Sequence, residues 1–427
     1  MDDTGRADAA GPPLGPPAVS CQGRPPLDAP APDPAALLAP WLRAARTPRA
    51  ARVRVDDRAW SLALADTLLT VPYDRPDGAL DALGDALDAL HAALPPGGDP
   101  HAPVALLWAT YDAAWHAAAP RPVTDARPAG DRCPAVFLAR VEVVADPADL
   151  PEEASPADPL PPFASVTGEA EHRAMVDAVR GRIRDGEVYL VNVARMIHRP
   201  AMSAEAVAAR VRRADAPRSM IAHAGDVCVA AMSMELALAW DRRAGVAVSR
   251  PIKGTRPRRA DPADDAREAA ALAADEKERA ENAMAVDVHR NDLGRVARVG
   301  GVTVPVLCGV EAHRYVHHLV STVRAEVDPG LSARAMLAAV LPVGSVTGAP
   351  KLAAMETIAA LEAERRGLYT GVYGLVFADG RVELTVAIRT LVLDAAGAHY
   401  GVGGGIVWDS DPGREWDELR WKQRGVE

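Results

Sequence analysis

Apolar residues in the first third of the chain recur at two spacings, which predict a mixture of helices and strands. Leucines at intervals of three and four predict a helix over residues 79–94 with one apolar face. The short continuous apolar run at 104–108 is typical of a buried strand. The first third therefore combines both kinds of element.

The same two spacings continue through the second half of the chain. Helices and strands do not alternate regularly there, so we expect an α+β fold rather than a doubly wound parallel sheet. The pattern predicts helices over 169–184, 264–289 and 350–365, and strands over 188–193, 227–232, 246–249, 382–393 and 399–402.

Composition divides the chain into three parts. Residues 1–33 are rich in proline, alanine and glycine without periodicity, and we expect disorder there. Residues 34–162 form an N-terminal part that ends in a connection rich in proline and acidic residues from 146 onward. Residues 163–427 carry most of the candidate chemistry.

Charge and cysteine content narrow the class of protein. The net charge of −10 over 427 residues argues against a nucleic-acid partner. No apolar run is long enough to span a bilayer, and the N-terminus does not resemble a signal peptide. The four cysteines are far apart, as expected of free thiols in a reducing compartment. We therefore predict a cytoplasmic protein without a membrane segment.

Lys253 is the first candidate for chemistry. Proline and glycine bracket it in the segment RPIKGTR, between a strand and a polar loop. A nucleophilic lysine must be neutral, and lowering its pKa from about 10.4 to near 7 costs roughly 4 to 5 kcal/mol. Burial or the neighbouring Arg250 and Arg256 would supply that shift. The alternative is a solvated loop lysine in a basic patch.

Two pairs of glutamates have helical spacing. Glu278 and Glu281 lie three residues apart, as do Glu415 and Glu418, so each pair shares a helix face. Four carboxylates supply the oxygen ligands that Mg²⁺ prefers. The alternative is that both pairs are ordinary charged, solvated faces.

The segment GSVTGAPK predicts a helix start that favours an anion. Thr347 or Ser345 is expected to cap the helix beginning near Pro350, leaving open N–H groups for a carboxylate. A simple capped turn is the alternative.

Three further candidates lie nearby in the sequence. Arg389 falls within a predicted apolar strand and needs an anionic partner, either a ligand carboxylate or an internal salt bridge. Three consecutive glycines, at 403–405, allow backbone N–H groups to contact a ligand or make a tight turn. His318 borders an apolar run and is either a site residue or a structural histidine.

Taken in order, these motifs resemble those of the chorismate-utilising enzymes. The resemblance rests on RPIKGT, AEN with RNDLGRV, HHLVS, GSVTGAPK, IRTL and GGGIV, between about residues 163 and 422. The family implies one α+β body of large antiparallel sheets flanked by helices, which the N-terminal part joins.

Within that family, the lysine of PIKGT resembles component I of aminodeoxychorismate synthase. Lys253 stands where anthranilate enzymes usually have alanine, and Thr347 also resembles this branch. Leu190 stands where isochorismate-forming relatives have a general-base lysine, which disfavours addition of water; the amine-forming branches usually have glutamine there. The resemblance implies conversion of chorismate and ammonia to 4-amino-4-deoxychorismate, toward para-aminobenzoate and folate. The alternatives are anthranilate synthase component I and a non-catalytic chorismate-binding member.

The resemblance also implies residue roles. Lys253 would attack the ring, Glu235 would protonate the departing hydroxyl, and His318 would lie near that hydroxyl. Met234 replaces the usual proline beside Glu235, a departure from the family pattern. Mg²⁺ would be held mainly by Glu281 and Glu418, with help from Glu278 and Glu415. Implied substrate contacts are Thr255, Thr347, Gly348, Tyr369, Arg389, Gly403, Gly404, Gly405 and Lys422.

The source of ammonia is expected to be another protein. None of the four cysteines lies in a Gly-x-Cys-x-Gly elbow, so the chain carries no glutaminase motif of that kind. The resemblance therefore predicts a separate glutamine amidotransferase subunit as partner.

Overall fold

The computed structural model describes residues 50–424, apart from 57, 75, 119–130, 132, 144–161, 201, 203 and 225. The predicted disordered segment 1–33 and most of the predicted connection at 146–162 lie outside the described residues. No helix in the described ranges is long and apolar enough to cross a membrane.

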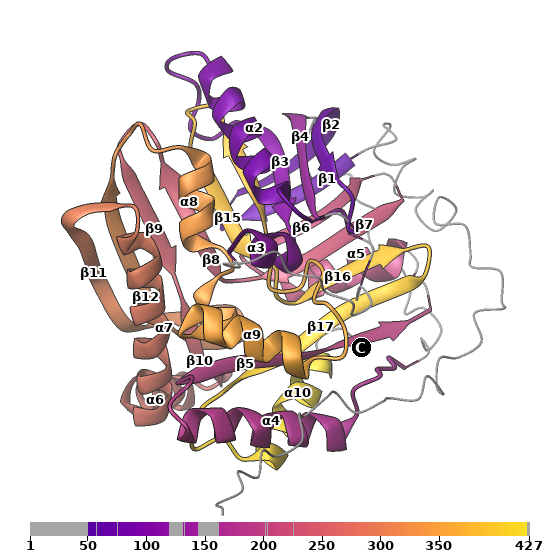
Figure 1. The fold of residues 1–427 in the computed structure, drawn as a ribbon, viewed down its shortest axis with the longest axis vertical. Coiled ribbons are helices and arrows are strands. Elements are labelled where there is room, and N and C mark those ends of the chain that lie inside the picture. Colours follow the sequence, from indigo (N-terminus) through magenta and orange to yellow (C-terminus); the bar gives the residue numbers. More distant parts are fainter. Residues whose placement is uncertain are drawn as a thin grey trace, which may run out of the picture. The chain divides into compact units, whose positions relative to one another are not determined.

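Strands dominate the described chain, and every named strand pair is antiparallel (Figure 1). The strands are β1 (Ala50–Val55), β2 (Arg58–Val71), β3 (Pro103–Ala109), β4 (Val136–Val143), β5 (Leu190–Arg199), β6 (Arg218–Ala224), β7 (Val227–Ser233), β8 (Leu236–Asp241), β9 (Val246–Arg250), β10 (Ile252–Pro257), β11 (Ala297–Ala312), β12 (Val316–Val327), β13 (Gly348–Ala349), β14 (Val372–Phe377), β15 (Val382–Val386), β16 (Thr390–Asp394) and β17 (Gly397–Ile406).

Helices connect and cover these strands. They are α2 (Ala79–Ala93), α3 (Tyr111–Ala118), α4 (Glu169–Arg184), α5 (Ala204–Ala214), α6 (Pro262–Ala274), α7 (Glu276–Gly294), α8 (Ala333–Val340), α9 (Lys351–Leu361) and α10 (Pro412–Arg424), with a 3₁₀ turn η2 at Gly344–Val346. This mixture confirms the predicted α+β class.

Strand pairing forms one continuous series. Its order is β11–β12–β9–β8–β15–β14–β3–β4–β2–β1–β6–β7–β16–β17–β5–β13. Strand β10 also pairs with β12, next to β9 on the same edge. The two ends of the series meet, because a Cβ atom on Gly405 of β17 would lie 3.8 Å from Nζ of Lys253 on β10. A curved sheet thus brings distant segments to one place.

The N-terminal strands belong to the same series. β3 pairs with β14 and β1 pairs with β6, so residues before 144 hydrogen-bond directly to strands of the second half.

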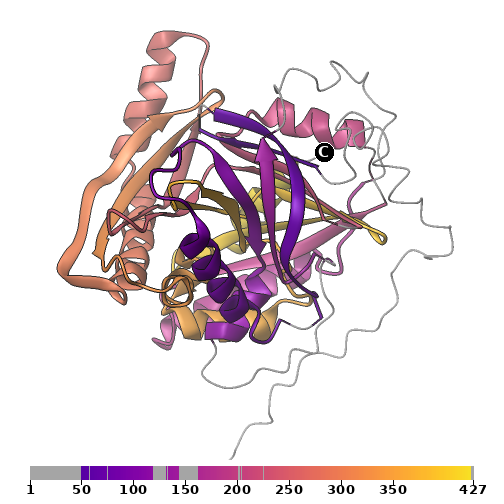
Figure 2. The same cartoon turned by 90° about the horizontal axis from the view of Figure 1, so that it is seen from above.

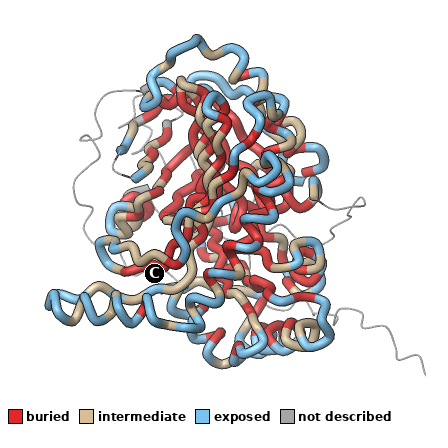
Figure 3. The backbone as a smooth tube through the Cα atoms, turned by 90° about the vertical axis from the view of Figure 1, so that its left-hand side faces the viewer, coloured by how far each residue is buried: buried red, intermediate tan, exposed pale blue. Residues whose placement is uncertain are grey.

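The leucine repeat of the first third forms the predicted helix. Helix α2 buries Leu83 and Leu87 against α8, and Gly84 lets the two helices approach closely, since its Cβ would lie 2.6 Å from the Arg334 Cα. Figure 3 shows buried stretches gathered in the interior strands and exposed stretches along turns and outer helix faces.

The predicted helix over 264–289 is wrong in one respect, because the structure divides it at Asp275. This residue has an extended backbone, ends α6 and caps α7 by accepting the N–H of Glu278 at 3.1 Å. Arg256 also pairs with its carboxylate at 2.6 Å. A capping aspartate therefore overrides a helical pattern that continues on both sides of it.

Two other predicted elements are shorter than expected. The strand predicted over 382–393 is two strands, β15 and β16, separated by Arg389 with a φ of 50°. The helix predicted over 350–365 ends at Leu361.

The long hairpin of β11 and β12 was not predicted. Most residues of β11 are exposed or half-buried, so the strand lacks the alternation that reveals a buried face. Helices α6 and α7 pack beside this hairpin (Figure 2).

Candidate active site

Lys253 lies where the two ends of the strand series meet. Its amine donates to the backbone carbonyl of Ser345 at 3.1 Å, and its side chain is half-buried. The strand has a register shift after Lys253, at Gly254, whose φ is +83°. A Cβ on Gly254 would lie 3.1 Å from both Glu278 and Leu272, so glycine lets β10 pass close to α7.

Glu235 lies in the connection between β7 and β8 and is 4% exposed. Its Oε1 accepts a hydrogen bond from the Ser345 hydroxyl at 2.5 Å. Burial raises the pKa of Glu235, although the Ser345 hydrogen bond and the charge of Lys253 oppose the shift. A carboxyl that retains its proton more readily is suited to act as a general acid.

His318 is buried on β12 beside the same strand. Its Nδ1 lies 3.0 Å from the Thr255 hydroxyl, and burial lowers its pKa to about 4. The ring is therefore neutral at pH 7. Its Nε2 is buried without a hydrogen-bond partner among the described residues, which leaves that atom for a ligand.

The turn at 344–350 differs from the predicted helix cap. Neither Ser345 nor Thr347 caps α9: the Thr347 hydroxyl donates to Val343 O at 2.8 Å, and the Ser345 hydroxyl donates to Glu235. Gly348 has a φ of 142°, and a Cβ there would lie 2.2 Å from Leu190 O on β5. The turn is thus fixed against β5 by backbone contacts.

The three predicted glycines lie on β17, not in a turn after it. A Cβ on Gly404 would lie 3.3 Å from a carboxylate oxygen of Glu415. The carbonyl of Gly403 accepts from the Lys422 amine at 2.7 Å, and the same amine pairs with Glu418 at 2.7 Å. The glycine strand therefore lies against α10, between Lys253 and the second glutamate pair.

Arg389 does not lie within an apolar strand, and that prediction is wrong. It is exposed between β15 and β16, and its guanidinium forms no hydrogen bond or ion pair with any other described residue. Its charge nevertheless contributes to lowering the pKa of His318. Among the residues that the structure describes, the Arg389 side chain is therefore an unpaired cation close to the site.

Tyr369 is buried among Ala194 and Met196. Its ring passes directly over Gly401 of β17, where a Cβ would lie 2.1 Å from the ring. Burial raises the pKa of its phenol, so the hydroxyl keeps its proton.

The four predicted glutamates are close enough for all of their charges to act on one lysine, Lys277. Partial burial opposes protonation of Lys277, but the charges of Glu281, Glu415, Glu278 and Glu418 raise its pKa. Burial raises the pKa of Glu278 and of Glu415, with like charges adding in each case. The pKa of Glu418 is lowered, chiefly by Lys422. Helices α7 and α10 thus bring both pairs around one cation.

The fit of this cluster to a metal rests on donor chemistry. No three Asp, Glu, His or Cys side chains in the described part of the chain already converge as a metal site. The four carboxylates are oxygen donors that repel one another, and Lys277 lies among them. Such a set fits a hard divalent cation that would replace the lysine charge.

All four lysines of the chain, among 48 basic residues, lie in this region. Lys351 is half-buried and pairs with buried Asp292 at 2.7 Å, and Asp292 lies beside Gly344 of the turn. The lysine ammonium is a compact charge that can lose its proton, whereas the arginine guanidinium is broad and stays charged. Arginine supplies the positive charge elsewhere in the chain. The small number of lysines is therefore the sequence feature by which Lys277 and Lys351 could have been found.

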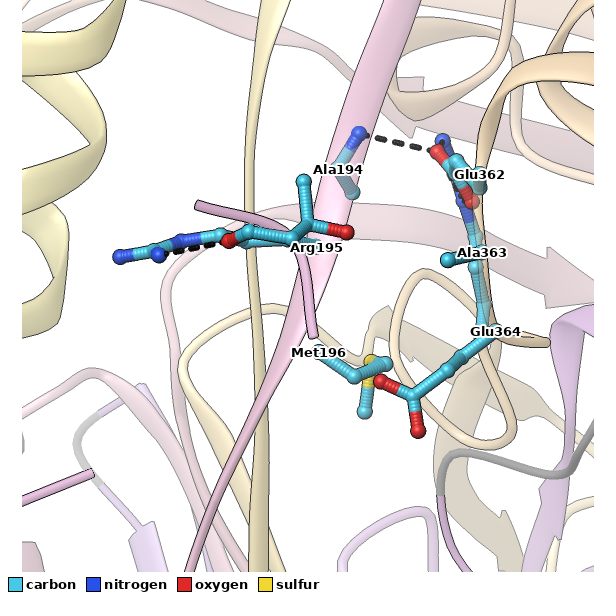
Figure 4. A pocket seen from close by; sticks show the side chains of 8 residues that line it. Ala194, Arg195, Met196, Glu362, Ala363 and Glu364 are labelled. Carbon is cyan, nitrogen blue, oxygen red and sulfur yellow. Dashed lines mark hydrogen bonds and ion pairs between the residues drawn. The ribbon is translucent and has the colours of Figure 1, made fainter. Parts of the chain in front are cut away.

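The sequence analysis did not identify the residues whose hydrogen bonds and ion pairs connect the elements around the site. Asn282 donates to Leu319 O at 2.9 Å and accepts from Ser321, which locks α7 to β12. Behind the site, Arg366 pairs with Glu362 at 2.7 Å, and Figure 4 shows Glu362 directed toward the Ala194 N–H of β5. These contacts join segments far apart in the sequence.

Comparison with known proteins shows the family of this chain. A model of the chorismate binding enzyme family matches residues 64–426. Anthranilate synthase component 1 of Streptomyces coelicolor is 39% identical over 296 residues, covering 69% of this chain and 56% of that protein. Aminodeoxychorismate synthase component 1 of Escherichia coli is 40% identical over 242 residues, covering 56% of this chain and 53% of that protein. The chain thus spans about half the length of these relatives.

Solved structures share the fold. Anthranilate synthase component I from Streptococcus pneumoniae has a TM-score of 0.67 at 24% identity, covering 88% of this chain and 89% of that one. The menaquinone-specific isochorismate synthase of Escherichia coli has a TM-score of 0.63 at 19% identity, covering 88% of this chain and 87% of that one. With a matching family model over most of its length, this chain belongs to the chorismate binding enzymes.

Proposed function

We propose that this chain aminates chorismate at C4, in the manner of aminodeoxychorismate synthase component I. The observation that carries the proposal is the pairing of Lys253 and Glu235 through one residue, Ser345, at distances of 3.1 and 2.5 Å. A nucleophile and a proton donor are thereby held side by side at the glycine strand.

The proposed first step forms a bond between Lys253 Nζ and C2 of the ring. Both double bonds of the ring diene shift by one position, the C4–O bond breaks, and Glu235 gives its proton to the departing hydroxyl, which leaves as water. Ammonia then adds at C4, both double bonds shift back, the bond to Lys253 breaks, and the added nitrogen returns a proton to Glu235. The buried Nε2 of His318 is available to hold the C4 hydroxyl.

Charge at the site supports binding of a dianion. The exposed guanidinium of Arg389, which has no ion-pair partner in the described part of the chain, suits one carboxylate. Mg²⁺ held by Glu278, Glu281, Glu415 and Glu418 would offset two of their negative charges and would attract the other carboxylate. Without a cation the four glutamates would repel the substrate.

Product analysis tests the proposal. We expect 4-amino-4-deoxychorismate when the chain is incubated with chorismate, an ammonium salt and Mg²⁺, identified by mass spectrometry. Lys253→Ala should lower the rate about 1,000-fold or more, since it removes the covalent route. Arg259→Ala, at an exposed arginine on the same segment, should retain the rate. Full activity of Lys253→Ala would remove the covalent step.

Anthranilate synthase component I is a second candidate. It is favoured by relatives of that name, including the Streptomyces coelicolor protein at 39% identity. The two products separate cleanly, because anthranilate is fluorescent. Anthranilate as the main product of the unmodified chain would replace the first proposal by the second.

We further infer a separate glutamine amidotransferase partner, which the component 1 names of the relatives support. The chain alone should then use ammonium salts and not glutamine. Turnover of glutamine by the isolated chain would rule out the need for that partner.

A further inference from the structure

Ser345 contacts both proposed catalytic side chains with different atoms. Its hydroxyl donates to Oε1 of Glu235 at 2.5 Å, and its backbone carbonyl accepts from the Lys253 amine at 3.1 Å. Ser345 is 2% exposed and Glu235 is 4% exposed, so the contact between the hydroxyl and the carboxyl is shielded from water. A hydrogen bond in such surroundings orients its partners more strongly than one in solvent.

The turn that carries Ser345 is held at each of its neighbours. A Cβ on Gly344 would lie 2.1 Å from Val288 of α7, so this position packs directly on the helix. Arg366 donates to Val346 O at 2.9 Å, and Asn192 N donates to Thr347 O at 2.9 Å. The serine therefore cannot move without displacing α7, β5 or the Arg366 contact.

We propose that Ser345 is a positioning residue that selects Oε2 of Glu235 as the oxygen carrying the transferable proton and holds the Lys253 amine in a fixed orientation beside it. The proposal rests on the function proposed above. The serine hydroxyl has one proton and gives it to Oε1, so Oε1 is occupied as an acceptor and Oε2 is left to carry the acid proton. One N–H of Lys253 is committed to the Ser345 carbonyl, which limits the directions in which the nitrogen lone pair can point once the ammonium group has lost a proton.

The electrostatic surroundings of Glu235 make this contact measurable. Lys253 is the charged group that acts on Glu235, and the backbone of Ile252 also donates to it. Both favour the ionised carboxylate, as the Ser345 hydroxyl does, against burial. Loss of the hydroxyl alone should therefore raise the pKa of Glu235 further.

The test compares three variants. Ser345→Ala removes the hydroxyl and keeps the backbone carbonyl. Ser345→Thr keeps a hydroxyl. Ser249→Ala is the matched control, since it removes another buried serine hydroxyl, one that contacts His289 at 2.6 Å instead of Glu235. Each is measured for kcat, KM and the pH midpoint of the Glu235 carboxyl band in infrared difference spectra, with Glu235→Gln assigning the band.

In Ser345→Ala we expect kcat to fall about 10- to 100-fold with KM changed less than about threefold. The Glu235 midpoint should rise by about one pH unit. Ser345→Thr should restore both values, and Ser249→Ala should change neither. An unchanged Glu235 midpoint in Ser345→Ala, or a threonine variant that behaves like the alanine variant, would overturn the proposal.

The infrared titration needs no turnover. If product analysis shows that the chain does not aminate chorismate, the Glu235 midpoint still reports the Ser345 contact. Failure of the contact and failure of the proposed function are therefore distinguishable.

Discussion

Two regions of this molecule contain clusters of charged side chains, one buried and one partly exposed, and they differ in how these charges are paired. Behind the site, Arg366 is fully buried and donates to Glu362, Asn192 O, Val346 O and Thr370. It also stacks on Tyr111 at 4.7 Å. The charges of Arg366 and Glu362 are thus paired with each other, and the hydrogen bonds of Arg366 fix the segments around it.

The glutamate cluster of α7 and α10 is instead only partly balanced, since Lys422 pairs with Glu418 and Lys277 pairs with Glu281 at a longer distance of 3.6 Å. Its carboxylates repel one another, and burial and like charge raise the pKa of Glu278 and Glu415. Such repulsion costs stability and persists where a ligand is to be bound. The comparison teaches that incompletely balanced charge, rather than buried charge, distinguishes the candidate site from the rest of the described structure.

The largest expected effect comes from breaking the balanced region. Arg366→Met should lower the free energy of unfolding by about 3 to 5 kcal/mol, because it leaves the buried Glu362 carboxylate without its cation. Urea unfolding measures the change. Arg290→Met, at an exposed arginine paired with exposed Asp287, should stay within about 0.5 kcal/mol of the unmodified protein. A loss below 1 kcal/mol for Arg366→Met would show that the two regions do not differ as argued.

Neutralising the unbalanced region should have a smaller effect on stability, with the opposite sign. Glu415→Gln should raise the free energy of unfolding by about 0.5 kcal/mol, because it removes repulsion from Glu418. It should also lower Mg²⁺-dependent activity and Mn²⁺ affinity about 10- to 100-fold. Urea unfolding and Mn²⁺ titration by electron paramagnetic resonance test both. Glu356→Gln on an exposed face of α9 is the control. A destabilised Glu415→Gln would contradict the comparison.

The smallest expected effect is the pH dependence of the stability gain in Glu415→Gln. Because the folded pKa of Glu415 is raised, its ionised form is disfavoured in the folded state at high pH. As pH falls through the folded pKa, the carboxyl takes up a proton and the penalty is lost. The advantage of Glu415→Gln over the unmodified protein should thus be full at pH 8 and shrink toward zero near pH 4.5, measured by urea unfolding across this range. An advantage that grows as pH falls would reverse the sign of the argument.

Much of the fold could be predicted because local pattern and tertiary packing agree. Helix α4 occupies residues 169–184 as predicted, and α2 buries the predicted leucine face. The pattern failed where a single side chain overrode it, as at Asp275, and where a strand such as β11 is largely exposed.

The sequence by itself determined which residue types are present for chemistry: a lysine bracketed by proline and glycine, two glutamate pairs and a glycine strand. It could not place Ser345 against Glu235 or Arg389 outside a strand, because these outcomes depend on contacts between segments more than 100 residues apart or on one left-handed backbone residue. Tertiary structure alone decided that the two ends of the strand series meet, since hydrogen-bonded strand order depends on long-range pairing that local periodicity does not encode.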